Sequence, residues 1–351
     1  MAQNSTNAAA ILAIPETEPE RLFQSPDFII RDYKDLLRQW HPDLNQNDPE
    51  AGKVTAHITT LFRMVREHIR LGKYNPPGAI IVADRAGKRF QIKYLARRPF
   101  ELGEMLISRG LVTFVIPKKH EDMVIHGLRQ IGSIRYPNEE FRRVLTDCFP
   151  RVVRSVETVD SWVICVHKEP HEVLLSDLIA HLGGQIEPKH VAWIMSSLLN
   201  LASFLEVSSL TLNAISPSTV FVSPEKHAVS LYGGWWYAQK GGGLITSLPP
   251  ETFPLASRRL REHKVATGEL DIECIRAIGR ACLGDPSGGS LRGRPDVPAT
   301  FAQYLLMPSG KSAIKEYQNW PTVLESSFGP RRFHKLDVTG NDVYPQGEVH
   351  G

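Results

Sequence analysis

Two prolines and a glycine break the chain near residue 77 and separate two kinds of apolar periodicity. The stretch is "GKYNPPGA", residues 72–79, where Gly72 fits a helix C-cap and Pro76-Pro77-Gly78 forbids helical continuation. Apolar residues recur at helical spacing before the break, and strand-like stretches follow it. We therefore expect a domain boundary here, as a chain of 351 residues is long for one compact core.

The part before the break predicts two amphipathic helices. Ser25 and Pro26 suit the start of the first, and Asp48-Pro49 suits the start of the second. Each has one apolar face, formed by Ile29, Tyr33, Leu36, Leu37 and Trp40 in the first and by Val54, Ile58, Leu61, Val65 and Ile69 in the second. Burial of one face against the other gives a helical hairpin, placed at residues 25–74 after a flexible N-terminus at 1–24.

The turn between these helices carries the tripeptide His41, Pro42 and Asp43. The first helix also has a second, cationic face, which is formed by Arg31, Lys34 and Arg38. Pro42 disfavours helical geometry at His41, so the tripeptide is expected in an exposed loop. A basic helix, an HPD loop and a return helix together resemble the J-domain of DnaJ-type co-chaperones. The resemblance implies that these six residues contact a DnaK-type chaperone and stimulate its ATP hydrolysis, with the cations attracting an acidic partner surface.

The J-like unit looks truncated. The family begins with a short helix that carries an aromatic residue and a "VLG"-like turn, and only "ERLFQSP", residues 20–26, stands in that place here. The alternative interpretation is a simple helical hairpin with a solvated charged face.

Residues 75–99 read as a linker and a β-hairpin with a turn at Gly87. One strand face is apolar and the other basic, and Arg97 and Arg98 follow closely. The hairpin therefore allows an alternative function, a structural or nucleic-acid-associated protein, although a solvated strand face is the simpler interpretation. The net charge of +3 gives no reason to expect bulk binding of nucleic acid.

From residue 100 onward, the order of elements predicts a small β-rich part and then a larger helical part. "FELGEMLISRGLVTFVI" reads as two strands, "RVVRSVETVDSWVICVHKEP" as two more, and "PKHVAWIMSSLLNLASFLEV" as a long apolar helix. This order resembles the bilobal protein-kinase fold. The resemblance implies an α+β fold class, with an N-lobe at about 100–170, a C-lobe at about 171–335 and a flexible tail at 336–351.

The segment after the long helix supports this resemblance. Pro217 and Val220-Phe221-Val222 follow the pattern of a kinase catalytic loop and its next strand. Glu251 in "LPPETFP" resembles the glutamate of the APE segment, and Asp271 resembles the aspartate that opens a large buried helix and braces the catalytic loop. "FGPRRFH" resembles the closing segment of some bacterial and viral kinase-like proteins that begin with a J-domain-like piece.

The side chains that phosphoryl transfer needs are missing from this pattern. The reaction requires a carboxylate to orient the attacking hydroxyl, and metal ligands to neutralise phosphate charge. The resemblance aligns Ala214 with the catalytic aspartate and Ser216 with the lysine that steadies the transferred group. It aligns Thr219 with the metal-binding asparagine and Tyr232 with the aspartate of DFG. The sources of electrostatic catalysis are therefore gone.

The phosphate-binding parts are incomplete as well. Gly103 and Gly110 do not make a G-x-G-x-x-G loop, and Lys118 and Lys119 follow a proline that spoils the match to the nucleotide lysine. The predicted function is a non-catalytic adaptor, in which a pseudokinase domain binds an unidentified client and the J-like unit engages a DnaK-type chaperone. The alternative enzyme function is an atypical active Ser/Thr protein kinase. No cofactor and no metal are expected.

The remaining sequence features indicate the cellular environment of the protein. The four cysteines, Cys148, Cys165, Cys274 and Cys282, show no zinc spacing and indicate reduced thiols. No stretch approaches the roughly 20 apolar residues needed to span a bilayer, so we expect a cytoplasmic protein without a membrane partner. Trp235-Trp236-Tyr237 either forms an exposed docking patch or fills the site that nucleotide vacated, and the glycines at 241–243 suggest a mobile segment.

Overall fold

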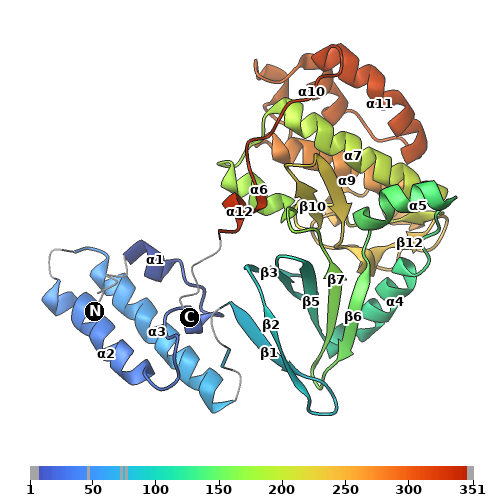
Figure 1. Cartoon of the computed structure of the whole chain (residues 1–351). Helices are drawn as coiled ribbons and strands as arrows, with labels where there is room; N and C mark the ends of the chain where they lie inside the picture. Colours follow the sequence, from blue (N-terminus) through green and yellow to red (C-terminus); the bar gives the residue numbers. More distant parts are fainter. Residues whose placement is uncertain (1–7, 46–47, 72–73, 76–77, 346–351) are drawn as a thin grey trace. The chain divides into compact units, whose positions relative to one another are not determined.

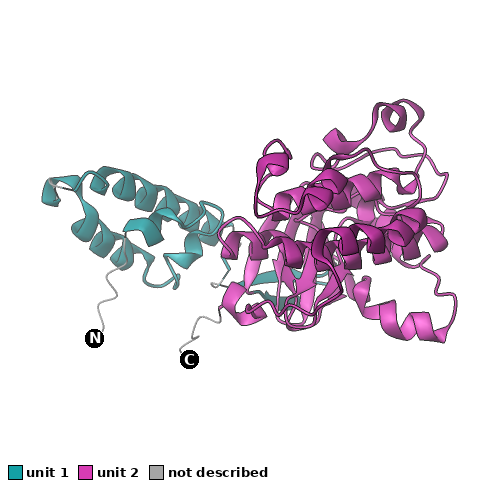
Figure 2. Ribbon diagram, turned by 90° about the horizontal axis from the view of Figure 1, so that it is seen from above, with its two compact units in different colours: residues 1–94 teal, residues 95–351 magenta. Residues whose placement is uncertain are grey.

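The computed structural model describes residues 8–45, 48–71, 74–75 and 78–345. The chain divides into two compact units, Met1–Tyr94 and Leu95–Gly351 (Figure 2). The β-hairpin after the proline break clusters with the first unit, so the break is not itself the division between the units. Gly72, Pro76 and Pro77 lie outside the described residues.

The described part of unit 1 contains three α-helices and a two-stranded hairpin (Figure 1): α1 Ala8–Leu12, α2 Ile29–Trp40, α3 Ala51–Arg70, β1 Ala79–Ala83 and β2 Arg89–Lys93. The helices α2 and α3 are antiparallel, because Thr55 Oγ1 donates to Trp40 O at 2.6 Å and the Tyr33 and Phe62 rings stack with centroids 3.9 Å apart. The expected helical hairpin is therefore present.

The helices of this hairpin begin later than the sequence predicts. α2 starts at Ile29 with Phe28 at its N-cap, and no side chain caps it. Ser25 is therefore not the cap that its residue type suggested. α3 starts at Ala51, and its apolar face is fully buried at Val54, Ile58, Leu61 and Val65.

The segment before α2, expected to be flexible over 1–24, belongs to the core of unit 1 in its described part. α1 packs on α3, and Ile11 and Phe23 are fully buried in the same cluster as Ile14. The unit therefore has a short helix ahead of α2 and is not reduced to a hairpin. The run "AAAILAI" that forms it lacks an aromatic residue, which is why the sequence pattern pointed to a truncation. Residues 1–7 lie outside the described residues.

Unit 2 opens with a five-stranded antiparallel sheet in the order β3-β4-β5-β7-β6. Its strands are β3 Ala96–Phe100, β4 Gly103–Ile107, β5 Leu111–Pro117, β6 Val152–Glu157 and β7 Ser161–His167. The two strands expected at 100–116 are β4 and β5, whereas β3, which a tight turn pairs with β4 from Phe100 to Gly103, was not expected. Helices α4, Glu121–Ile131, and α5, Glu139–Leu145, separate β5 from β6.

A larger helical part follows, and the chain therefore has an α+β fold with its β-rich part first, as the element order predicted. Its helices are α6 Leu175–His181, α7 Pro188–Val207, α8 Arg258–His263, α9 Gly268–Cys282, α10 Ala299–Leu306, α11 Ala313–Phe328 and α12 Gly340–Val343. Short strands β8 Val173–Leu174, β10 Val220–Ser223 and β11 Ala228–Leu231 form one small sheet, and β9 Leu210–Thr211 pairs with β12 Gln239–Lys240.

Helix α7 is the core helix of the helical part. It packs on α9 and α11, and its side chains Ile194, Met195 and Leu198 are fully buried. Among the described helices, α7 has the length and composition to cross a membrane, which the sequence analysis did not expect. However, 61% of its most apolar window is buried inside the fold. A helix that is apolar all round is also what a buried core position requires.

The C-terminal segment, expected to be flexible from residue 336, is ordered as far as 345. Tyr344 follows α12 and is only 7% exposed. Its hydroxyl donates to Asp177 Oδ2 at 2.6 Å and accepts from Leu174 N at 3.1 Å. A buried ring with two hydrogen bonds fixes this part of the tail on α6 and β8. Residues 346–351 lie outside the described residues.

Candidate functional site

The loop between β9 and β10, residues 212–219, is braced by the first turn of α9. Asp271 is 2% exposed, and its carboxylate accepts hydrogen bonds from Leu212 N at 2.9 Å and Asn213 N at 2.6 Å. Burial raises the pKa of Asp271 to about 6, and the two backbone donors act in the opposite direction. Asn213 is held at φ +62°, a strained region for a residue with a side chain. These are the contacts that the kinase resemblance implied for Asp271.

The position aligned with the catalytic base is closed. Ala214 is 1% exposed, and the backbone of Gly234 lies directly against it. A Cβ on Gly234 would lie 2.8 Å from the Ala214 Cβ, and φ at Gly234 is +81°. Only a glycine meets both requirements without strain. The loop therefore offers neither a proton acceptor at residue 214 nor room for a substrate hydroxyl beside it.

The two hydroxyl residues of the loop hold the loop itself. Thr219 Oγ1 donates to Ala214 O at 2.7 Å and accepts from Ser216 N at 2.9 Å. Ser216 Oγ lies 2.8 Å from Ser218 Oγ, which donates to the exposed Glu251 at 2.5 Å. Because these polar atoms already have partners, Ser216 and Thr219 act as turn-forming side chains in this arrangement.

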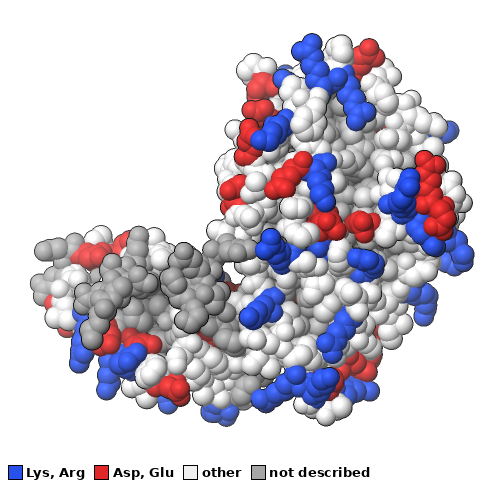
Figure 3. All heavy atoms as spheres, viewed as in Figure 1, with Lys and Arg blue, Asp and Glu red and all other residues white. Residues whose placement is uncertain are grey.

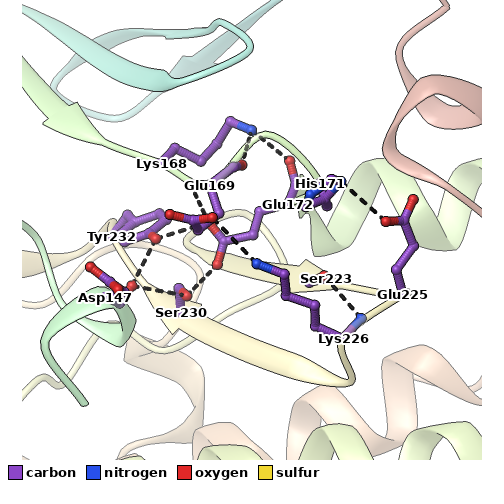
Figure 4. A network of polar contacts seen from close by, with 10 residues as sticks. All are labelled: Asp147, Lys168, Glu169, His171, Glu172, Ser223, Glu225, Lys226, Ser230 and Tyr232. Atoms are coloured by element: carbon purple, nitrogen blue, oxygen red, sulfur yellow. Dashed lines mark hydrogen bonds and ion pairs between the residues drawn. The ribbon is translucent and has the colours of Figure 1, made fainter. Parts of the chain in front are cut away.

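Tyr232, aligned with the DFG aspartate, is a member of a buried polar network (Figure 4). Its hydroxyl lies 2.8 Å from both Asp147 O and Glu172 Oε2, and Ser230 Oγ donates to Glu172 Oε1 at 2.5 Å. The Tyr232 hydroxyl is the donor shared between these two acceptors. Burial raises the pKa of Glu172, and the hydroxyls of Ser230 and Tyr232 act in the opposite direction.

Lys168 belongs to the same network and was missed at the level of sequence. It is 1% exposed, and its ammonium group donates to Glu169 O and Glu172 O, each at 2.8 Å (Figure 4). Burial lowers the pKa of Lys168 to about 8. The only signal in the sequence is the charged run "HKEPHE" directly after an apolar strand. Lys118, considered earlier for a nucleotide contact, is instead ion-paired with Glu157.

The aromatic triplet is buried, which contradicts the exposed docking patch. Trp235, Trp236 and Tyr237 are between 1% and 5% exposed. Trp236 packs edge-to-face on Phe114 of β5 with centroids 5.5 Å apart, and it fills the space that a side chain at Gly127 of α4 would need. The triplet therefore wedges α4 against the sheet, and the sequence lacks any local sign of this because Gly127 lies more than a hundred positions earlier.

The glycines at 241–243 form an ordered turn, contrary to the mobile segment expected there. Gly243 N donates to Lys240 O at 2.8 Å, and Gly242 N donates to Ala266 O at 2.9 Å. Gly242 has φ +79°, which explains the glycine at that position. The turn connects β12 to the segment that leads toward α8.

In unit 1 the HPD tripeptide forms a single 3-10 turn at Pro42–Leu44. His41 Nδ1 accepts from Asp43 N at 3.2 Å, which caps that turn. The His41 side chain is 46% exposed and that of Asp43 is 85% exposed. The tripeptide therefore lies in an exposed, locally ordered turn, as predicted.

The cationic face of α2 is partly neutralised on the helix itself. Arg31 pairs with Asp32 and Arg38 pairs with Asp35, both at 3.2 Å, and Lys34 is exposed. Ion pairs this exposed contribute little to stability, so they leave the cations available to a partner.

The basic residues expected together at the hairpin are divided between β3, which carries Arg97 and Arg98, and the β1–β2 hairpin itself. In unit 2, Arg97 makes a two-oxygen contact with Glu104 at 2.6 and 2.8 Å, and Arg98 pairs with Asp177 at 2.9 Å. Lys88 and Arg89 on unit 1 are exposed. Over unit 2 as drawn in Figure 3, Lys and Arg side chains are interspersed with Asp and Glu. Within the described ranges, no group of three or more His, Cys, Asp or Glu side chains is placed to hold a metal ion.

Neither the scan of protein-family models nor the search of curated proteins found a match. Among solved structures, the chain is similar to one described as the structure of vaccinia related kinase 3. The identity is 14%, the similarity covers 72% of this chain and 92% of that chain, and the TM-score is 0.48. A likeness of this size carries no weight for function, so the proposals below rest on the contacts within this chain.

Proposed function

We propose that the protein is a non-catalytic adaptor, in which unit 2 is a kinase-like scaffold without phosphoryl-transfer chemistry and unit 1 engages a DnaK-type chaperone. The observation that carries the first half is the closure of Gly234 over Ala214. A kinase needs an open carboxylate at that place to orient the attacking hydroxyl. In this chain the methyl group of Ala214 lies at that place, packed against the backbone of Gly234.

Three arrangements support a kinase-like ancestry for unit 2. A small antiparallel sheet precedes a helical part built around α7. Asp271 at the start of α9 holds the backbone of the loop at 212–213. The small sheet containing β10 and β11 follows that loop directly. The polar groups that remain, such as Tyr232 and Thr219, are engaged inside the protein rather than presented to a nucleotide and its metal ion.

The chaperone-binding half rests on unit 1. His41, Pro42 and Asp43 are presented on an ordered turn between two packed antiparallel helices, and Arg31, Lys34 and Arg38 lie on the preceding helix. The short helix α1 packs on α3. A client bound to unit 2 would then be delivered to the chaperone by the same chain.

A transfer assay tests the catalytic half. The full-length protein is incubated with labelled ATP and Mg²⁺, alone and with a mixed protein substrate. We expect no incorporation into the chain or the substrate. Incorporation that is lost in Asp271→Asn, and retained in the surface variant Lys315→Glu, would establish an active atypical kinase and overturn this half of the proposal.

A further inference from the structure

We propose that residues 240–265, the segment between β12 and α9, form a docking surface for an acidic, partly apolar protein segment. This 240–265 surface carries five Lys or Arg residues against two Glu, a formal charge of +3 that equals the net charge of the whole chain. The cations are Lys240, Arg258, Arg259, Arg261 and Lys264, and the glutamates are Glu251 and Glu262. Cations therefore outnumber carboxylates by more than two to one in this stretch.

An exposed apolar pair lies within this surface. Leu244 is 62% exposed and Val265 is 41% exposed, and the two residues oppose each other in an isolated antiparallel bridge. The flanking bonds, from Ile245 N to Lys264 O and from Ala266 N to Gly243 O, make them a non-hydrogen-bonded pair. Side chains approach most closely in such a pair, so Leu244 and Val265 form one continuous apolar patch.

Cations border this patch and a second apolar side chain. Phe253 is 52% exposed, and the Arg261 guanidinium lies 5.9 Å from its ring centroid. Arg258 is paired with Glu262 at 2.7 Å. Over the described ranges, neither Arg259 nor Lys264 has a carboxylate within ion-pair distance. Unpaired cations beside exposed apolar groups favour a partner that brings both carboxylates and apolar side chains.

The surface is held in shape before any partner arrives. The glycine turn at 241–243 is hydrogen-bonded to the same segment that carries Val265. Gly241 also lines a hollow together with Ser209, Thr211, Thr267 and Lys311. A preformed surface loses little conformational freedom on binding, which favours docking of an extended segment.

The composition of the surface favours protein over nucleic acid. The apolar pair and Phe253 have no role in contacting phosphates. The inference deepens the proposed scaffold role by naming the chemistry of the client, and it does not depend on chaperone contact by unit 1.

The test measures binding of a fluorescent peptide to the full-length protein by anisotropy. The probe is a synthetic peptide that combines Glu with Leu and Phe, and its control has every Glu replaced by Gln. We expect the Glu peptide to bind, with an affinity that falls about tenfold in the double variant Arg259→Glu/Arg261→Glu and by about threefold in Leu244→Ser. The exposed α11 variant Lys315→Glu should bind as the wild type does.

Three results would overturn the proposal. They are equal binding of the Gln peptide, unchanged binding in the double variant, and tighter binding of a duplex oligonucleotide of the same net charge. All substituted side chains are exposed, so circular dichroism should show an unchanged fold in each variant. If the peptide does not bind but chaperone stimulation is intact, only the proposal for the 240–265 surface is wrong. If chaperone stimulation is absent but the peptide binds, only the proposed role of unit 1 is wrong.

Discussion

At the scale of single residues, Gly234 determines the state of the loop at 212–219. Its φ is +81° and its backbone approaches Ala214 closely, and only a residue without a Cβ satisfies both conditions. The close approach of Gly234 to Ala214 therefore depends on two small residues, a glycine packed against an alanine. A carboxylate at residue 214 and a side chain at residue 234 are each incompatible with it.

Substitution of Gly234 by Ala should destabilise unit 2 by about 3 kcal/mol, because a strained φ and a steric clash add together. Gly242→Ala is the matched control, since Gly242 has φ +79° but nothing lies within 4 Å of an added Cβ. It should cost only about 1 kcal/mol. Denaturant unfolding measures both, and equal costs would mean that the contact with Ala214 is not tight.

Restoring the missing carboxylate should not restore chemistry. Ala214→Asp would bury a charge without a partner against the Gly234 backbone, and we expect it to lower stability by about 3 kcal/mol. Labelled ATP should give no phosphoryl transfer by this variant. Transfer by Ala214→Asp, absent from the wild type, would show that the site needs only one residue to work.

The pH dependence of stability should report on Asp271. Its pKa is raised from 3.8 to about 6, so the folded state holds this proton more tightly than the unfolded chain does. The group therefore contributes stability below pH 3.8, and the contribution is lost as the pH rises to about 6. The unfolding free energy of the wild type minus that of Asp271→Asn should fall by about 3 kcal/mol across this window. A difference that stays constant with pH would show that Asp271 has an ordinary pKa.

At the scale of elements, α4 is held in one position by an aromatic wedge. Trp236 packs on Gly127 of α4 and on Phe114 of β5, and His126 Nε2 lies 2.7 Å from Ala238 O. Contacts to both a strand and a backbone carbonyl leave the helix little freedom to shift. This fixed α4 suits a scaffold better than a switch.

Removing the wedge should loosen α4 selectively. Trp236→Ala leaves a cavity, with an expected cost of about 4 kcal/mol, and the amides of α4 should exchange with solvent much faster than those of α7. Hydrogen exchange resolves the two helices. Tyr317→Ala, at a partly exposed position on α11, is the control and should leave the exchange of α4 unchanged. Uniform acceleration of all helices in Trp236→Ala would mean that α4 is not a separate unit of stability.

The sequence predicted the elements that carry local signals. The α2–α3 pair and α7 follow apolar periodicity, and the position of Asp271 follows its place at the start of a helix. Elements defined by distant contacts were missed. Tyr344 is fixed by Asp177, which lies 167 positions away, and Tyr232 is bonded to Asp147, which lies 85 positions away. Local patterns do not contain such pairings.

At the scale of the whole molecule, two compact units divide the proposed work. Unit 1 presents the exposed HPD turn over a well-packed helical core. Unit 2 has an α+β fold whose loop at 212–219 is closed by Gly234 and whose 240–265 surface is exposed and basic. In the function proposed above, one chain would couple capture of a client to recruitment of a chaperone.

The most direct test is the steady-state ATP turnover of a DnaK-type chaperone with the full-length protein. We expect the wild type to stimulate turnover several-fold and His41→Gln to lose that stimulation, because His41 shapes and presents the exposed turn. His263→Gln, at an exposed histidine of α8, should stimulate as the wild type does. No stimulation by the wild type, or equal stimulation by His41→Gln, would contradict the adaptor role proposed for this chain.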